Sequence, residues 1–209
     1  MTQIRRIQDA EVAGKRVLVR VDFNVPMKDG AVSDDTRLQA ALPTIEYLQE
    51  RGAKTILLAH FGRPKGQRVD EMSLEPVGQP LADLLGSEVC FVDDTVGDDA
   101  LSAIADLENG DVLLLQNTRY EPGEEKDDAD SAQALADLGA GYVNDAFSAA
   151  HRAHGTTNGV ARILPASAGL AMQREIDHLV AALGEPEQKV ATVTSRGLAA
   201  RGAPQPRTR

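Results

Sequence analysis

The sequence predicts an open α/β fold with three layers, α/β/α, around a mainly parallel sheet of the Rossmann-like type. Short apolar runs alternate along the chain with amphipathic segments, as they do where a parallel sheet carries crossover helices on both faces. Aromatic residues make up only 3% of the 209 residues, and none is Trp. The core must therefore be filled by Val, Leu, Ile and Ala, which is typical of buried parallel strands.

The elements follow from these patterns in chain order. Apolar runs bounded by turn residues are predicted as strands, at 16–21, 55–59, 88–92, 111–115 and 141–143. Segments with apolar residues at three- and four-residue steps are predicted as helices, at 35–51, 74–85, 100–107, 129–138 and 169–183. In the first helix Leu38, Ile45 and Leu48 share one face, and Gly52 follows as a stop signal.

Charge and composition exclude several classes of protein. A net charge of −10 argues against nucleic acid or an anionic membrane as the main partner, because both require a basic face. No stretch approaches the roughly 18 apolar residues of a membrane span, and residues 1–6 lack the apolar core of a secretion signal. The single Cys90 lies in an apolar run and is expected to be a small buried hydrophobe in a reducing, cytoplasmic compartment.

Polar residues cluster directly after four of the predicted strands. The carboxyl ends of parallel strands meet at one edge of a sheet, where ligands bind. The residues are Asp22, Asn24 and Arg37 after the first strand, His60, Gly62, Arg63 and Lys65 after the second, Asn117 and Arg119 after the fourth, and Asn144, Asp145, His151, Arg152 and His154 after the fifth.

Arginines dominate this set, although the chain is acidic overall. Guanidinium groups brought together repel one another unless a multiply charged anion lies among them, and their planar forks suit phosphate and carboxylate. The alternative is that each Arg pairs with its own acidic neighbour at the surface. The run from His60 to Pro64 is also compatible with a plain tight turn, in which Gly62 and Pro64 serve the backbone.

Other kinds of site find no support in the sequence. No G-x-G-x-x-G follows the first strand, and no G-x-x-x-x-G-K-[ST] occurs, so dinucleotide and Walker-type nucleotide sites are not indicated. His151 and His154 lack further Cys or His residues nearby to complete a tetrahedral zinc site. We predict no metal ligand in this chain.

The same residues resemble the phosphoglycerate kinase family. The matching runs occur in family order and at family-like spacing over residues 1–187: 14–26 (GKRVLVRVDFNVP), 35–37 (DTR), 60–66 (HFGRPKG), 73–77 (SLEPV), 117–120 (NTRY), 122–127 (PGEEKD) and 142–154 (YVNDAFSAAHRAH). Small departures from the family pattern fall at Gln116, Thr118 and Ser148. The resemblance implies the fold of the N-terminal, Rossmann-like domain of these kinases.

The resemblance also implies roles for individual residues. It assigns the binding of 3-phosphoglycerate to Asp22, Asn24, Arg37, His60, Arg63, Arg119 and Arg152. The basic patch around phosphate and carboxylate is represented by His60 with three arginines, Arg63, Arg119 and Arg152. Asp22 and Asn24 resemble the partners of the substrate hydroxyl and carboxylate. Arg37 resembles the residue that reaches the transferring phosphoryl group, and it is the one catalytic candidate.

The implied reaction is reversible phosphoryl transfer between 1,3-bisphosphoglycerate and ADP, giving 3-phosphoglycerate and ATP in glycolysis. The implied enzyme is a cytoplasmic monomer that uses magnesium with ATP or ADP. At 193–197 (VTSRG) the match ends, where the family has a Gly-Gly-Ala-Lys loop and then its nucleotide domain. The residues that bind nucleotide and magnesium in the family are therefore missing from this chain.

We accordingly predict a substrate-binding domain over 1–170, an interdomain-type helix and linker over 171–187, and a truncated tail over 188–209. Residues 189–193 have the composition of a further strand, whereas 197–209 are rich in Arg, Pro and Gly and are expected to be disordered. Two alternatives stand beside a kinase half: a non-catalytic module that binds phosphorylated three-carbon acids, and a degenerate truncated product.

Overall fold

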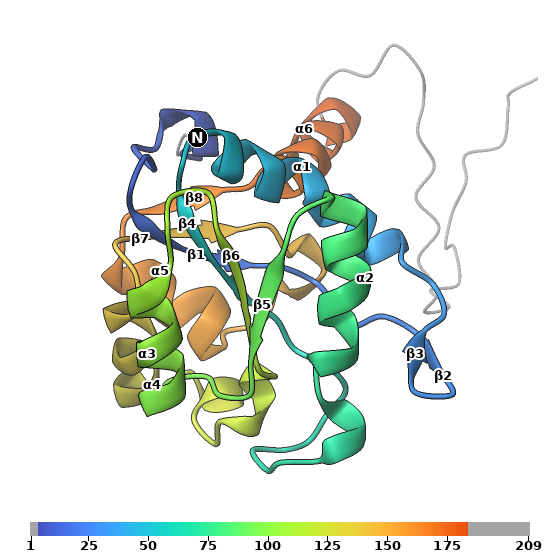
Figure 1. Ribbon diagram of the computed structural model, residues 1–209. Coiled ribbons are helices and arrows are strands. Elements are labelled where there is room, and N and C mark those ends of the chain that lie inside the picture. The colour runs from blue at the N-terminus through green and yellow to red at the C-terminus, as the bar shows by residue number, and fades with distance from the viewer. Residues whose placement is uncertain (1–3, 184–209) are drawn as a thin grey trace, which may run out of the picture.

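A six-stranded parallel sheet forms the centre of the protein (Figure 1). The computed structural model describes residues 4–183. The strand order is β5-β6-β4-β1-β7-β8, and every neighbouring pair is parallel. The strands are β1 Arg16–Arg20, β4 Lys54–Leu58, β5 Val89–Val92, β6 Val112–Leu115, β7 Gly141–Asn144 and β8 Ala166–Ala168. The predicted open α/β sheet is confirmed.

Helices cover both faces of the sheet, because successive side chains of a strand point to opposite sides. Val17 and Val19 of β1 face a core shared with α1 Thr36–Glu50 and α2 Glu75–Leu85. Leu18 faces a second core shared with α3 Asp98–Asp106, α4 Ala129–Asp137 and α5 Val160–Ile163. The helix α6 Leu170–Leu183 lies against α1 (Figure 1). The three-layer prediction is therefore confirmed.

Several short elements of the fold were not predicted from the sequence. A two-stranded antiparallel ribbon, β2 Met27–Lys28 with β3 Ala31–Val32, projects beside α2 (Figure 1). Its turn is Asp29-Gly30, with φ of 52° and 79°, and this dipeptide is itself a strong hairpin signal. Strand β8 reads only Ala-Ser-Ala, which is too short and too plain to stand out.

Single helical turns also escaped prediction, since one turn has no periodicity to detect. They are η1 Ile7–Asp9, η2 Asp70–Met72, η3 Thr118–Tyr120, η4 Glu124–Lys126, η5 Phe147–Ala149 and the π-helical turn η6 Gly155–Gly159. The last four come after β6 and β7 in the chain. They shape the loops that carry the candidate site.

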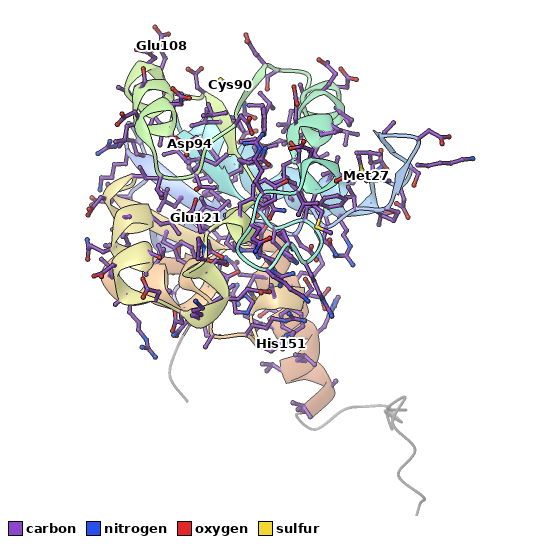
Figure 2. All side chains as sticks on the ribbon, turned by 90° about the horizontal axis from the view of Figure 1, so that it is seen from below. Met27, Cys90, Asp94, Glu108, Glu121 and His151 are labelled. Atoms are coloured by element: carbon purple, nitrogen blue, oxygen red, sulfur yellow. The ribbon has the colours of Figure 1, made fainter. Side chains whose placement is uncertain are left out.

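The expectation for Cys90 was wrong, because its thiol is exposed. Strand β5 lies at one end of the sheet, and Figure 2 places Cys90 at the periphery of the molecule. An edge strand has a neighbour on one side only, so an apolar run there need not be buried.

Some expectations concern the last part of the chain. The predicted strand at 189–193 and the predicted disorder of 197–209 lie outside the described residues. The division into domains at residues 170 and 187 also stays a prediction. Within residues 4–183, no helix has the length and apolar character needed to cross a bilayer.

Candidate anion-binding site

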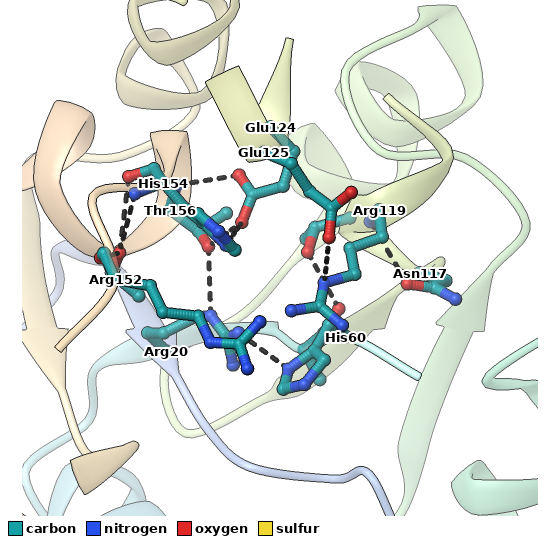
Figure 3. Close-up of polar contacts among 12 residues, drawn as sticks. Arg20, His60, Asn117, Arg119, Glu124, Glu125, Arg152, His154 and Thr156 are labelled. Carbon is teal, nitrogen blue, oxygen red and sulfur yellow. Dashed lines mark hydrogen bonds and ion pairs between the residues drawn. The ribbon is translucent and has the colours of Figure 1, made fainter. Parts of the chain in front are cut away.

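Arg20, the last residue of β1, connects several parts of the candidate site (Figure 3). Its side chain is buried, with 1% of the residue exposed. Nη2 lies 2.8 Å from His60 Nδ1, and Nε donates to Thr156 Oγ1 at 3.0 Å. Nη1 donates to the carbonyl oxygen of Val21. A buried guanidinium thus ties the end of β1 to the loop after β4 and to η6.

His60 is held neutral in this setting. Burial, followed by the charges of Arg20 and Arg119, lowers the pKa of His60 to about 3. Neutral imidazole has one ring nitrogen that donates and one that accepts. Arg20, His60, Arg119 and Arg152 are called the cluster below. Its positive charge therefore comes from the arginines, while His60 contributes polar ring atoms.

Arg119 reaches the cluster from η3, the turn that follows β6. Asn117 Oδ1 accepts from its backbone N–H at 3.1 Å, and Nη1 donates to the carbonyl oxygen of Gly62 at 2.7 Å. Nε lies 3.3 Å from Glu125 Oε1, yet this buried N–H has no hydrogen-bond partner among residues 4–183. The contact with Glu125 is therefore a charge contact of poor hydrogen-bond geometry, and a donor is left over.

Arg152 and Arg63 have no carboxylate within 4.0 Å in the part of the chain that the structure describes. Arg152 extends toward His60 and Arg20 in Figure 3, and its charge helps to lower the pKa of His60. Its Nε contact is with His151 Nε2, at 3.4 Å. Arg63 is exposed and follows Gly62 directly, and no side-chain hydrogen bond or ion pair within residues 4–183 joins it to the cluster.

A second group lies beside the cluster and contains Arg37. Its Nη1 lies 2.5 Å from Asp22 Oδ2, and Ser148 Oγ donates to the same oxygen at 2.5 Å. Although partial burial opposes the effect, hydrogen bonds from Ser148 and Arg37 lower the pKa of Asp22. A hollow of about 370 Å³ is lined by Asp22, Arg37, Ser148 and Arg174, among others.

Asn24 connects the two groups through the backbone. Its Oδ1 accepts from the N–H of Gly62 at 2.9 Å, and its own N–H donates to Asp22 Oδ1 at 3.2 Å. In this structure Asn24 therefore orients the loop after β4, while its Nδ2 has no hydrogen-bond partner within residues 4–183. Asp145, which also follows β7, accepts from the N–H groups of Ala171 and Met172 at the start of α6.

The backbone of the loop after β4 is held against the segment after β6. Gly66 has a φ of +74°, and a Cβ there would lie 2.9 Å from the Cα of Pro122. Its N–H donates to the carbonyl oxygen of Arg119 at 3.1 Å. Glycine is needed at this position for both conformation and space, and the close approach holds the backbone of the loop after β4 against the segment that contains Arg119.

The predicted convergence is therefore present for part of the set. The structure brings together His60, Arg119 and Arg152, and it places Asp22, Asn24 and Arg37 beside them. Pairing with an acidic neighbour applies to Arg37 and in part to Arg119. Arg20, Glu124 and Thr156 were missed: a charged residue inside the apolar run 16–21 was a usable signal for Arg20, and Glu124 lies in the family-like run 122–127, whereas nothing local marked Thr156.

Comparison with known proteins shows to which family this chain belongs. The family model described as phosphoglycerate kinase matches residues 7–195. The chain belongs to the phosphoglycerate kinase family. A phosphoglycerate kinase from Maricaulis maris is 70% identical over 190 residues, which are 91% of this chain and 47% of the relative. One from Caulobacter vibrioides is 59% identical over 186 residues, 89% of this chain and 47% of the relative.

Solved structures of phosphoglycerate kinases share the fold. The structure from Coxiella burnetii has a TM-score of 0.80 at 34% identity, and the match covers 89% of this chain and 46% of that one. The structure from Pyrococcus horikoshii has a TM-score of 0.80 at 35% identity, with 87% and 46% covered. The chain thus spans about half the length of the phosphoglycerate kinases that it matches.

A metal ion in a protein needs several donor side chains brought together. Within residues 4–183 no group of three or more His, Cys, Asp or Glu side chains is arranged to hold an ion. His154, one of the two histidines considered for zinc, instead has its Nδ1 3.9 Å from the buried Glu124 Oε1. Magnesium, which the family resemblance implies, is therefore not assigned to any residue in this half.

Proposed function

We propose that this chain binds 3-phosphoglycerate and forms the substrate-binding half of a phosphoglycerate kinase. The observation that supports this proposal most strongly is the set of guanidinium donors without a carboxylate partner. Arg63 and Arg152 have none within 4.0 Å in the described region, and Arg119 Nε has no hydrogen bond there. In a chain of net charge −10, such an uncompensated cationic site favours a small anion with several charges.

The chemistry of 3-phosphoglycerate matches this set of groups. Its phosphate and carboxylate each accept paired N–H donors from a guanidinium fork. We assign these anionic ends to Arg63, Arg119, Arg152 and His60. Asp22 and Asn24 are assigned to the substrate hydroxyl and carboxylate, for which Asn24 Nδ2 still has a donor to offer.

The proposed reaction is phosphoryl transfer between the acyl phosphate of 1,3-bisphosphoglycerate and ADP. In the reverse direction the substrate carboxylate is itself the nucleophile, so this half need not supply a general base. Arg37 is proposed to offset the repulsion between the two anions, and it must then exchange Asp22 for the transferring group. Nucleotide and magnesium are assigned to residues beyond this half, in an enzyme that we propose to be a cytoplasmic, glycolytic monomer.

Calorimetric titration with 3-phosphoglycerate tests the binding proposal. The unaltered chain should bind, and Arg63→Ala and Arg119→Ala should each weaken binding by about 10- to 100-fold, as expected for a charged hydrogen bond of roughly 1.5–3 kcal/mol. Arg16→Ala is the matched control, since Arg16 is exposed and lies at the amino end of β1, away from the carboxyl ends of the strands. Absence of heat with the unaltered chain would contradict the proposal.

Catalytic turnover by this chain requires a separate assay. Since positioning two bound reactants contributes roughly 7–11 kcal/mol to such a reaction, the chain alone should bind substrate but transfer phosphoryl groups very slowly or not at all. A coupled assay with ATP, magnesium and 3-phosphoglycerate measures this. Turnover at the rate of a complete phosphoglycerate kinase would show that this chain is more than a substrate-binding half.

A further inference from the structure

A continuous chain of hydrogen bonds runs beneath the site, from Glu124 through Thr156 and Arg20 to His60 (Figure 3). Glu124 Oε2 accepts from the backbone N–H of Thr156 at 2.8 Å, and Oε1 lies 2.5 Å from Thr156 Oγ1. Arg20 Nε lies 3.0 Å from the same hydroxyl, and Arg20 Nη2 lies 2.8 Å from His60 Nδ1. All these residues are buried, with 0% to 8% of each exposed.

The directions of the two bonds that Arg20 makes in this hydrogen-bond chain are fixed by chemistry. A guanidinium group only donates, so His60 Nδ1 must accept from Arg20 and cannot carry a proton. The proton of neutral His60 is then on Nε2. At the other end Arg20 Nε donates to Thr156 Oγ1, so the Thr156 hydroxyl can donate its own proton to an ionised Glu124. Ionised Glu124 accepts both bonds from Thr156 and satisfies this arrangement.

We propose that Glu124, Thr156 and Arg20 are positioning residues that fix His60 in its Nε2–H tautomer, so that a neutral imidazole offers a hydrogen-bond donor to the bound anion. In residues 4–183 His60 Nε2 has no protein partner, which is the condition for such a role. The inference relies on the proposed function only for the identity of the anion. The tautomer itself is a property of the ligand-free protein.

The charges of Glu124 and Arg20 explain why the hydrogen-bond chain requires both residues. A buried guanidinium without a nearby carboxylate would be strongly unfavourable, and the charge of Glu124 lies close enough to Arg20 to favour its protonated form. Burial raises the pKa of Glu124, whereas the bonds from Thr156 and the charge of Arg20 oppose that rise. Glu124 and Arg20 therefore each favour the charged form of the other, against the effect of burial.

The tautomer can be measured directly by long-range ¹H–¹⁵N correlation spectra of the histidine rings at pH 7, without ligand. The His60 signals are assigned by their loss in His60→Asn. The expected pattern is a protonated Nε2 and an unprotonated Nδ1. A protonated Nδ1 would overturn the proposal even if 3-phosphoglycerate binds, whereas the expected tautomer with no binding would contradict the proposed function alone.

Glu124→Gln separates positioning from simple electrostatics. Removing a negative charge near an anion site should strengthen anion binding if charge alone matters. Positioning predicts the opposite: a mixture of His60 tautomers and binding of 3-phosphoglycerate weakened about tenfold, which is the order expected for one charged hydrogen bond. Tighter binding with an unchanged tautomer would overturn the inference.

Thr156→Val removes the hydroxyl that joins the two ends, and it should have the same two effects. Thr156→Ser restores the hydroxyl and should restore both tautomer and affinity. Tyr142→Phe is the structural control, because the Tyr142 hydroxyl donates to the carbonyl oxygen of Thr156 at 2.6 Å and takes no part in the chain. It should lower stability but leave the His60 tautomer unchanged. An unchanged tautomer in a folded Thr156→Val variant would contradict the proposal.

Discussion

Arg37 and Asp22 form the shortest ion pair of the candidate site, with 2.5 Å between Nη1 and Oδ2. Asp22 Oδ2 also accepts from Ser148 Oγ, so the carboxylate is well satisfied without a ligand. Arg37 is 46% exposed at its side chain, and its charge is already compensated. Arg119 and Arg152 differ, because their donors are poorly used in the absence of a ligand.

This difference predicts a ranking of binding effects. Arg37→Met should weaken the binding of 3-phosphoglycerate by less than about threefold. The charge of Arg37 is already compensated by Asp22, and an exposed ion pair contributes only ~0–1 kcal/mol. Arg152→Met should weaken it by about 10- to 100-fold, since a charged hydrogen bond to the ligand would be lost. Calorimetry on both variants provides the comparison. Equal losses for Arg37→Met and Arg152→Met would show that Arg37 leaves Asp22 as soon as substrate binds.

The lowered pKa of His60 predicts that the stability of the protein depends on pH. Its pKa is lowered to about 3 in the folded protein, whereas an unfolded histidine titrates near 6.5. Between these values the unfolded chain binds more protons, so the free energy of unfolding falls as the pH falls. At pH 4.5, about two units below the unfolded pKa, the loss attributable to His60 is on the order of 2 kcal/mol.

His60→Asn isolates this contribution from the carboxyl groups that titrate in the same range. The Asn Oδ1 can take the place of Nδ1 as acceptor from Arg20, but the side chain does not titrate. Urea unfolding at pH 7.5 and pH 4.5 should therefore show a shallower loss of stability in the variant than in the parent. Parallel losses in the two proteins would mean that His60 keeps an ordinary pKa.

The sheet and its main helices were predictable because their signals are repeated along the sequence. Leu38, Ile45 and Leu48 lie on one face of a long helix, and all of them are buried, so each supports the same prediction. Strand β8 and the turns η3 to η6 contain too few residues for any period to appear. The Asp29-Gly30 turn is the exception, since a two-residue signal for the β2–β3 ribbon was present and was overlooked.

The candidate site was predictable only where a residue lies next to a strand end. His60 and Arg119 follow β4 and β6 closely, so the parallel sheet alone places them together. Glu124 and Thr156 lie further along their loops, and their contact depends on how η4 and η6 pack. The pairing of Arg37 with Asp22 in place of a ligand depends on side-chain rotamers, which no spacing rule specifies.

Gly66 predicts that the loop after β4 cannot accept a side chain. Gly66→Ala should lower the free energy of unfolding by about 2–4 kcal/mol, combining roughly 1–2 kcal/mol for the left-handed backbone with the overlap against Pro122. Gly86→Ala is the matched control, because Gly86 has a φ of +64° but a Cβ added there would meet no atom within 4 Å. Urea unfolding should show a loss of only about 1–2 kcal/mol for this control.

The same pair of variants reports on the site. Because Gly66 holds the Arg63 loop against the Arg119 segment, Gly66→Ala should also weaken the binding of 3-phosphoglycerate, whereas Gly86→Ala should not. Gly86 ends α2, and a Cβ added there would meet no atom within 4 Å. Binding that is unchanged in a folded Gly66→Ala variant would show that the loop relaxes without moving Arg63.

Gln116 directly follows β6, and all of its buried side-chain polar atoms are used. Oε1 accepts from the N–H groups of Leu74 and Asn117 at 3.0 and 2.8 Å. Nε2 donates to Ser73 Oγ at 2.9 Å and to Asp93 Oδ1 at 2.6 Å. A carboxylate in place of this amide would face Asp93 directly, and like charges at such a distance raise the pKa of one of the two carboxyl groups.

Gln116→Glu should therefore be less stable than the parent at pH 7, by about 1–3 kcal/mol for a lost buried hydrogen bond and the added repulsion. A carboxyl pKa raised by folding means that the folded protein binds the extra proton, so this deficit should shrink as the pH falls from 7 toward 5. Gln116→Leu is the control, because it loses the hydrogen bonds of both Oε1 and Nε2 without adding a charge, and its larger deficit should stay the same between pH 7 and 5. Urea unfolding of the two variants at both pH values decides the matter, and a Gln116→Glu deficit that is constant between pH 7 and 5 would mean that the new carboxylate turns away from Asp93.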